Sequence, residues 1–221
     1  MQLKRNANRI FAPTFLITGL TLQVIAYFWM PDTPWSLVSG MLGICSVVLC
    51  SVGNIFTFLF GFAQIATYTY ICYRNNLYGN IGINVFYFLS QLYGIYLWRK
   101  RGANTTEQVQ TRRLPIKTWL LLLASVIVVS LLTGYLLDRY TDDPHPYLDA
   151  FTTVPAILAQ ILLVLAYSEQ WIMWFAIDII YVILWAQAGN GCMLMQYIFW
   201  CMNCVYGYWN WTRKNEGGNN K

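Results

Sequence analysis

The sequence predicts an all-α protein that crosses a membrane several times. Composition is the first observation: 57% of the 221 residues are hydrophobic and 10% are charged, whereas soluble domains carry about 25% charged residues. Hydropathy is the second, because the apolar runs have the roughly 17–25 residues that a bilayer core requires. The placement of Lys and Arg is the third, since it orients those runs across the membrane.

About eight transmembrane helices are expected. Gly and Pro separate the runs, and Ser51-Val-Gly-Asn54 supplies a turn inside what would otherwise be one long helix over 36–73. The expected spans cover residues 13–30, 36–53, 55–73, 79–98, 118–137, 148–167, 170–187 and 191–211.

The first run follows several basic residues, as a cleavable signal peptide would. Its apolar stretch from Phe15 to Met30 is longer than a usual signal-peptide core and ends without a small-x-small cleavage site. Residues 1–35 are therefore expected to form an extra N-terminal transmembrane helix that is retained.

Charge placement agrees with eight spans and a cytoplasmic N-terminus. Of the 14 Lys and Arg residues, only Arg74 and Arg139 then lie on the outer side. The acidic turn 138–149, which contains the single His145, also lies outside. Because this asymmetry accounts for the net charge of +5, no nucleic-acid partner is expected. Both termini are expected in the cytoplasm.

An internal repeat organises the chain. The run Tyr93-Gly-Ile-Tyr-Leu-Trp98 returns as Tyr206-Gly-Tyr-Trp-Asn-Trp211, and basic residues follow both copies. Residues 36–98 and 148–214 are thus predicted to be parallel triple-helix repeats. Residues 99–147 join them as a basic cytoplasmic loop, a linking helix and an acidic outer loop, and 215–221 form a flexible C-terminal tail. Parallel repeats with a site at the membrane midplane are one plan of transporters.

Asp178 is the only acidic residue in the interior of an expected span, since Asp149 lies at the very start of its span, and Asp178 shares one helix face with two indoles. Trp171, Trp174 and Asp178 are at positions i, i+3 and i+7. A charged group at membrane depth costs about 2.5 kcal/mol or more unless it faces a polar cavity or partner. This face is suited to a flat cationic ring, because aromatic faces stack on rings and attract positive charge.

Other polar and aromatic residues in the spans could line the same cavity. Amides both donate and accept hydrogen bonds, as a pocket for ribose hydroxyls or a carboxamide requires. Amides also bridge membrane helices at about 0.6 kcal/mol each, so both roles stay open. The further candidates are Gln64, Tyr68, Asn84, Tyr87, Gln91, Gln196, Tyr197, Trp200 and Asn203.

Residues near the span ends have simpler expected roles. Trp29, Trp35, Trp98, Trp119 and Trp211 are expected to anchor the helices at the membrane interface. Close helix packing is expected at Gly61, Gly82 and Gly94.

No cofactor, metal or catalytic machinery is expected. The six cysteines lie in or beside apolar runs, and Cys201-Met-Asn-Cys204 has neither a second cysteine pair nor a nearby His to form a metal or redox site. There is no P-loop pattern. A membrane enzyme or assembly factor is the alternative from another class, but the scattered thiols, one His and one intramembrane acid do not form a catalytic cluster.

Several of these motifs resemble the PnuC family of vitamin transporters. They are Trp171-x-x-Trp174-x-x-x-Asp178, the Gly-rich turn at 189–191, the closing Tyr-Gly-Tyr-Trp-x-Trp, and Leu77-Tyr-Gly-Asn80 with the run 92–99. The resemblance covers about residues 36–214. It implies a SWEET-like arrangement of three, one and three helices in a bacterial inner membrane, without a cofactor, and a homo-oligomer with a trimer as the expected form.

The resemblance also implies a function. Family members take up nicotinamide riboside down its gradient, and a cytosolic kinase traps it by phosphorylation. Trp171 and Trp174 would wall the heterocycle, Asp178 would orient the site, and the amides would contact ribose or amide groups. Thiamine or riboflavin transport on the same fold, and proton coupling through Asp178, remain alternatives. A SWEET-type sugar transporter is a further alternative, which the paired indoles disfavour.

Overall fold

The structure is built from α-helices. This computed structural model describes residues 2–29, 33–74, 78–103, 108–189 and 191–218, and within them the chain forms eight helices. In chain order they are α1 (Gln2–Trp29), α2 (Pro34–Val52), α3 (Thr57–Arg74), α4 (Tyr78–Lys100), α5 (Ile116–Tyr140), α6 (Pro146–Val164), α7 (Gln170–Gln187) and α8 (Gly191–Gly218).

Each helix coincides with one of the eight expected spans, so the predicted fold class is confirmed. The predicted turn after α2 is present, with Gly53 in the left-handed region at φ 77°. α6 ends earlier than its expected span, at Val164, because Ala166 turns the chain with φ 57°. α8 extends to Gly218, so residues 215–218 of the predicted tail are helical, and 219–221 lie outside the described residues.

Four helices, α2, α5, α6 and α7, are long and apolar enough to cross a membrane by length and composition alone. The apolar part of α1 is slightly shorter, at Pro13–Trp29. α3, α4 and α8 carry Gln, Asn and Tyr on faces that line an internal cavity, which lowers their hydropathy. The polar residues on those faces are thus directed into the bundle.

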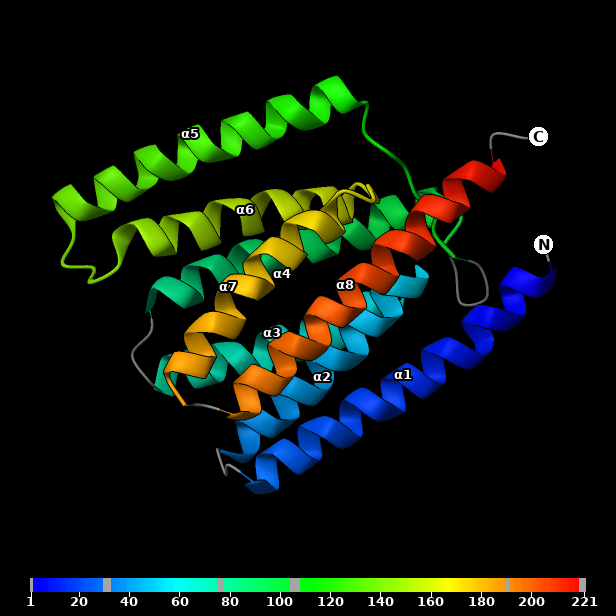
Figure 1. The fold of residues 1–221 in the computed structure, drawn as a ribbon, viewed down its shortest axis with the longest axis horizontal. Coiled ribbons are helices and arrows are strands. Elements are labelled where there is room, and N and C mark those ends of the chain that lie inside the picture. Colours follow the sequence, from blue (N-terminus) through cyan, green and yellow to red (C-terminus); the bar gives the residue numbers. More distant parts are fainter. Residues whose placement is uncertain (1, 30–32, 75–77, 104–107, 190, 219–221) are drawn as a thin grey trace.

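The helices lie roughly along one direction, and both termini are at the same end (Figure 1). We call this the basic end, where α1, α3, α5 and α7 begin, and the opposite one the acidic end. α2 contacts α8 and α4 contacts α6, so the two groups α2–α4 and α6–α8 interlock. α5 packs against α6 on one side of the bundle, while α1 lies on the other side against α2 and α8.

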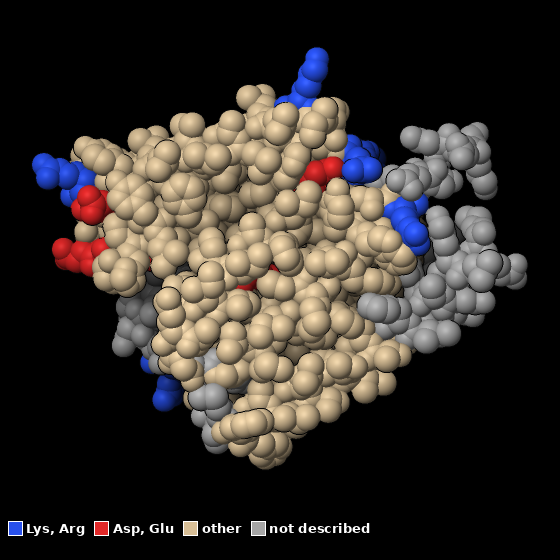
Figure 2. Space-filling model, viewed as in Figure 1, with Lys and Arg blue, Asp and Glu red and all other residues tan. Residues whose placement is uncertain are grey.

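Charges divide between these two ends (Figure 2). The described basic residues near or beyond the ends of helices at the basic end are Lys4, Arg5, Arg9, Arg99, Lys100, Arg101, Arg112, Arg113, Lys117, Arg213 and Lys214. The acidic end has the Asp-rich turn between α5 and α6, together with Arg74 and Arg139. This is the separation that the sequence predicts for the two faces of a membrane.

Two buried tryptophans connect the groups α2–α4 and α6–α8 in the same way. The Trp98 indole on α4 donates to the Leu163 carbonyl on α6 over 3.2 Å, and the Trp211 indole on α8 donates to the Cys50 carbonyl on α2 over 3.1 Å. Trp98 and Trp211 are 113 positions apart, and so are Cys50 and Leu163. A shift of 113 positions along the sequence therefore relates the donor and the acceptor of one contact to those of the other.

The packing beneath these tryptophans repeats with the same shift. The Phe58 ring meets Trp98 edge-on with centroids 4.9 Å apart, and Trp171 meets Trp211 edge-on at 5.6 Å. A Cβ added at Gly94 would lie 2.6 Å from the Phe58 ring, and one at Gly207 would lie 2.5 Å from Trp171. These matched contacts support the predicted repeats, which we propose as the organisation of the chain.

The expectation of interfacial anchoring is wrong for three of the five tryptophans. Trp29 and Trp35 are exposed near helix ends, but Trp98 and Trp211 are 0% exposed and Trp119 is also buried. The indole N–H groups of Trp98 and Trp211 find backbone acceptors on the opposite group of helices, which removes the need for water at the interface. A position near the end of a span therefore did not distinguish the exposed tryptophans from the buried ones.

Candidate functional site

One large cavity lies among α2, α3, α4, α6, α7 and α8, with a volume of about 650 Å³, and Thr133 and Leu137 of α5 also line it. All twelve residues that the sequence predicts for the site line it: Gln64, Tyr68, Asn84, Tyr87, Gln91, Trp171, Trp174, Asp178, Gln196, Tyr197, Trp200 and Asn203. Polar residues collect here because a membrane helix buries its polar face against other helices or a cavity. The structure thus brings the candidates together, and their roles in binding are addressed under the proposed function.

The cavity extends toward the acidic end, and toward the basic end its lining reaches Cys50, Phe58 and Trp171 but not Trp98 or Trp211. Its lining on α2 begins at Ser36, and Asp143 and Asp149 line it near the start of α6. On α4 and α8 the lining stops at Gln91 and Cys204. Trp98 and Trp211 lie about two turns beyond these residues.

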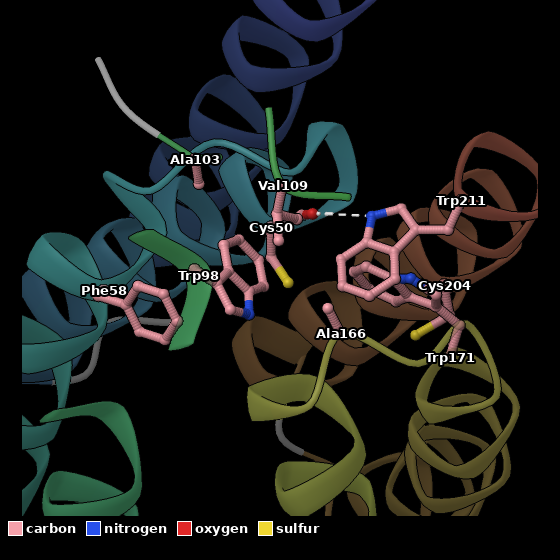
Figure 3. Packing of buried hydrophobic residues seen from close by; sticks show 9 residues of the cluster. All are labelled: Cys50, Phe58, Trp98, Ala103, Val109, Ala166, Trp171, Cys204 and Trp211. Atoms are coloured by element: carbon pink, nitrogen blue, oxygen red, sulfur yellow. Dashed lines mark hydrogen bonds between the residues drawn. The ribbon is translucent and has the colours of Figure 1, made fainter. Parts of the chain in front are cut away.

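A layer of aromatic rings closes the basic end (Figure 3). Trp98 and Trp211 lie side by side with centroids 5.8 Å apart and rings inclined by 60°. Phe58 and Trp171 flank the pair in the same buried cluster, which also contains Cys50. The interdigitated rings separate the cavity from the basic end.

A short strap, residues 108–113, lies over this layer. The Val109 amide donates to the Gly53 carbonyl over 3.0 Å, and the Arg112 amide donates to the Ala166 carbonyl over 2.8 Å. Gly53 and Ala166 are the two left-handed corners after α2 and α6, and 113 positions separate them. The strap therefore joins equivalent corners of the two helix groups.

Side-chain contacts fasten the strap further. The Thr111 hydroxyl donates to the Trp211 carbonyl over 3.0 Å, and the Val109 side chain is buried against the tryptophan layer. The Arg101 guanidinium, just before the strap, donates to the Leu165 carbonyl. Burial and the neighbouring Arg112 lower the pKa of Arg101 from its ordinary value.

Trp171 and Trp174 differ in how much surface they offer. Trp171 is 3% exposed, with its ring between Trp211 and the glycine notch at Gly207. Trp174 is only partly buried. Of the two indoles, Trp174 is the one with a face available to a ligand.

Asp178 is 3% exposed and accepts a weak hydrogen bond from the Cys204 thiol, with Sγ 3.6 Å from Oδ2. No other partner of this carboxylate is found among the described residues. A carboxylate at this depth gains most from a cationic partner in the cavity.

Among the five predicted amides, Asn84, Gln91 and Asn203 show both bridging groups and groups without a partner in the described residues. Asn84 Nδ2 donates to the Thr69 hydroxyl over 3.1 Å, and Asn203 Nδ2 donates to the Val47 carbonyl over 3.1 Å. These nitrogens bridge helices, which is one of the two roles that the sequence left open for the amides. In contrast, Gln91 Oε1 and Asn203 Oδ1 are buried acceptors without a partner in the described part of the chain.

Aromatic residues line the part of the cavity nearer the acidic end. Tyr181 stacks on Tyr197 with centroids 4.8 Å apart, and Tyr197 meets Trp200 edge-on at 5.1 Å. Tyr181 and Trp185 are site residues that the sequence analysis missed. They continue the face of Trp171, Trp174 and Asp178 by a further one and two turns, so helical spacing could have found them.

A family model described as "Nicotinamide mononucleotide transporter" matches residues 33–213. The chain belongs to this family. Two curated members carry the name nicotinamide riboside transporter PnuC. The Neisseria mucosa protein is 34% identical over 215 residues, covering 92% of this chain and 81% of that protein. The Haemophilus influenzae protein is 32% identical, covering 92% and 90%.

A solved structure of a similar protein has the same fold. The structure titled "Crystal structure of the Vitamin B3 transporter PnuC" matches with a TM-score of 0.78 and 33% identity, covering 93% of this chain and 92% of that one. The predicted resemblance is thus confirmed, and the protein is a multi-pass membrane transporter. All the site residues lie inside the family match, whereas α1 lies before it.

Proposed function

We propose that this protein takes up nicotinamide riboside by facilitated diffusion and that cytosolic phosphorylation retains the product. The observation that carries the proposal is the chemistry of the cavity. Aromatic rings and three carboxylates, Asp143, Asp149 and Asp178, line it, and none of its described lining residues is Lys or Arg. The names of the two curated relatives support the same substrate.

The charge of the cavity favours the riboside over the mononucleotide in the family description. Nicotinamide riboside is a cationic pyridinium ring on an uncharged ribose. The mononucleotide adds a phosphate with about −1.5 to −2 charges at neutral pH, and no cation in the described lining would pair with it. Like charges brought together in a binding site cost several kcal/mol. The same discrimination would prevent a phosphorylated product from leaving again.

Individual residues have proposed roles in binding. Trp174 stacks on the pyridinium ring, and Asp178 offsets its positive charge. Gln91 Oε1 and Asn203 Oδ1, the buried acceptors, accept hydrogen bonds from ribose hydroxyls. Trp171 supports this arrangement from behind through its contact with Trp211.

We further infer that the described structure is a state that opens outward. Basic residues favour the cytoplasmic side, so we assign the basic end, with both termini, to the cytoplasm of the bacterial cell. The cavity reaches the acidic end and is closed at the basic end by the tryptophan layer. The trimer implied by the resemblance stays a prediction, which a mass measurement on the detergent-solubilised protein tests.

Calorimetric titration of the purified protein tests the substrate. Nicotinamide riboside, nicotinamide mononucleotide, thiamine and riboflavin are compared, and we expect the riboside to bind at least about tenfold more tightly than the mononucleotide. Asp178→Asn should weaken binding of the cationic riboside more than binding of its uncharged dihydro form. Tighter binding of thiamine or riboflavin would leave the protein a vitamin transporter but contradict nicotinamide riboside as its substrate.

Uptake into liposomes tests the mechanism. We expect saturable uptake of nicotinamide riboside that stops at equal concentrations inside and outside, without a proton or sodium gradient. Accumulation above the external concentration only when a proton gradient is imposed would overturn facilitated diffusion in favour of coupling. Enclosing a riboside kinase and ATP should restore net accumulation.

A further inference from the structure

α6 contributes a further buried amide to the cavity, which the sequence analysis also missed. Gln160 is 6% exposed and lines the cavity. It lies inside the expected span 148–167, where a polar side chain is as costly to place as in the other spans. The hydrogen-bonding groups of this amide therefore need a partner on another helix or in the cavity.

The nitrogen of this amide is held by α4. Gln160 Nε2 donates to the Ser90 hydroxyl over 2.8 Å, and that hydroxyl donates its own proton to the Tyr87 carbonyl over 2.8 Å. A serine hydroxyl has a single proton, so Ser90 Oγ can only accept a hydrogen bond from α6. The amide of Gln160 must therefore turn its nitrogen, and not its oxygen, toward Ser90.

The oxygen of the amide is left for the cavity. No partner of Gln160 Oε1 is found among the described residues, and this oxygen is not one of the unpaired side-chain atoms that are sealed from solvent. Because the residue lines the cavity, a hydrogen-bond donor in the cavity can reach this acceptor. Gln160 thus offers a fixed acceptor on the α6 side of the cavity.

The equivalent contact between α2 and α8 has the same form. Asn203 lies 113 positions after Ser90, and Val47 lies 113 positions before Gln160. There Asn203 Nδ2 donates to the Val47 carbonyl over 3.1 Å, and Oδ1 has no partner in the described part of the chain. On both sides where the two helix groups meet, one amide nitrogen bridges the helices and its oxygen stays unpaired.

We propose that Gln160 is a substrate-binding residue, whose Oε1 accepts a hydrogen bond from a hydroxyl or an amide N–H group of the substrate, and that Ser90 is its positioning residue. This inference rests on the proposed function, because it concerns the same cavity and its substrate. The ribose hydroxyls and the carboxamide of nicotinamide riboside offer such donors. A glutamine has three side-chain torsions, and a ligand that must order them loses affinity. The contact with Ser90 orders them before the ligand arrives.

Calorimetry on the full-length protein tests the inference in a double-mutant cycle of Gln160→Leu, Ser90→Ala and the double variant. The ligands are nicotinamide riboside, its 2′-, 3′- and 5′-deoxy analogues, and the analogue with a dimethylated carboxamide. Each analogue lacks one kind of donor. Thr67→Val is the matched control, because its hydroxyl donates to carbonyls of its own helix and does not line the cavity.

We expect Gln160→Leu to weaken binding of nicotinamide riboside about three- to tenfold, which is the effect of losing one hydrogen bond. At least one analogue should bind Gln160→Leu as tightly as it binds the unmodified protein, since that analogue lacks the donor to Oε1. Ser90→Ala should weaken riboside binding about two- to fivefold and have no further effect when residue 160 is Leu. Thr67→Val should stay within about twofold.

Unchanged riboside affinity in Gln160→Leu would overturn the inference, because a residue that only bridges α4 and α6 affects stability and not recognition. A loss of the same size for the riboside and for every analogue would also overturn it. Melting temperatures without ligand show whether the variants fold. If Gln160→Leu does not fold, Ser90→Ala decides with the same ligands, and it should then weaken binding of the riboside but not of the analogue that lacks the donor.

The inference and the proposed function fail in different ways. If the unmodified protein binds thiamine or riboflavin in place of nicotinamide riboside, the proposed substrate is wrong. The same variants are then titrated with the vitamin that binds, since both carry hydroxyl groups. If the riboside binds and Gln160→Leu leaves its affinity unchanged, the proposed function stands and only Gln160 is removed from the site.

Discussion

The two groups of helices α2–α4 and α6–α8 share their closure at the basic end but differ where they line the cavity. Trp98 and Trp211 occupy equivalent places and make equivalent bonds. Deeper in the membrane, Gly61 in one group is matched by Trp174 in the other, and Ile65 by Asp178. Equivalent frameworks therefore surround an asymmetric cavity.

This difference corresponds to a ligand with two unlike ends. The second group supplies the indole and the carboxylate suited to a cationic ring. At the position of Cys204 the first group has Gln91, an amide suited to hydroxyls. Substitutions among the residues that line the cavity can thus change the substrate while the tryptophan layer at the basic end is kept.

The largest expected effect tests the shared closure. Trp98→Ala and Trp211→Ala should each lower the free energy of unfolding by about 3–5 kcal/mol, because each removes a fully buried indole. The measurement is thermal or denaturant unfolding in detergent, with Trp29→Ala as the exposed control. A large loss for one tryptophan and none for the other would end the equivalence of the two groups.

A smaller pair of changes tests the packing under the tryptophans. Gly94→Ala and Gly207→Ala should each cost about 1–3 kcal/mol, since the added methyl group would overlap the Phe58 or Trp171 ring. Gly82→Ala is the control, because nothing lies within 4 Å of its added Cβ. Melting temperatures that fall for only one of the two glycines would show that the groups are packed differently.

Trp174→Ala tests the asymmetric lining. We expect it to weaken nicotinamide riboside binding by about 1–3 kcal/mol, which is the effect of removing an aromatic ring that stacks on a base. Trp171→Phe, which introduces the residue found at the equivalent position 58, should lower the melting temperature and weaken binding less. Calorimetry and melting curves on both variants check this, and the reverse order would assign the stacking surface to Trp171.

The smallest expected effect concerns the mouth of the cavity. Asp149 is matched by Ser36 in the first group, and both line the cavity. Asp149→Ser should slow association of the cationic riboside about two- to tenfold at low ionic strength, by removing electrostatic steering. Stopped-flow association rates should converge with those of the unmodified protein at high salt. A difference that persists at high salt would indicate direct contact with the ligand.

Helical periodicity and the cost of polar groups in a membrane were sufficient to predict the fold and twelve of the residues that line the cavity. Asp178 and the amides had to face inward wherever the helices packed, so the sequence located them without knowing their neighbours. The strap was not predictable in this way. Its position depends on backbone hydrogen bonds to Gly53 and Ala166, which leave no pattern in the side chains of residues 108–113.

Other errors have the same origin in tertiary contacts. Trp211 has the sequence signature of an interfacial anchor. Its burial depends on a helix far away in the sequence, where the Cys50 carbonyl accepts its indole hydrogen bond. Gly82 was expected at a close packing point and has open space around it, unlike Gly61, where an added Cβ would lie 2.5 Å from Gln91 Oε1. A small residue permits close approach but does not by itself produce a neighbour.

The strap also bears on the speed of the transport cycle. In the proposed orientation, a carrier that opens its cytoplasmic side at the basic end would have to separate these backbone hydrogen bonds, whose net values are about 0.5–1.5 kcal/mol each. Residues 108–113 lie outside the substrate cavity. Turnover number can therefore be tuned by changes such as Val109→Pro, which deletes one of these donors, while the affinity for the vitamin is left to residues elsewhere.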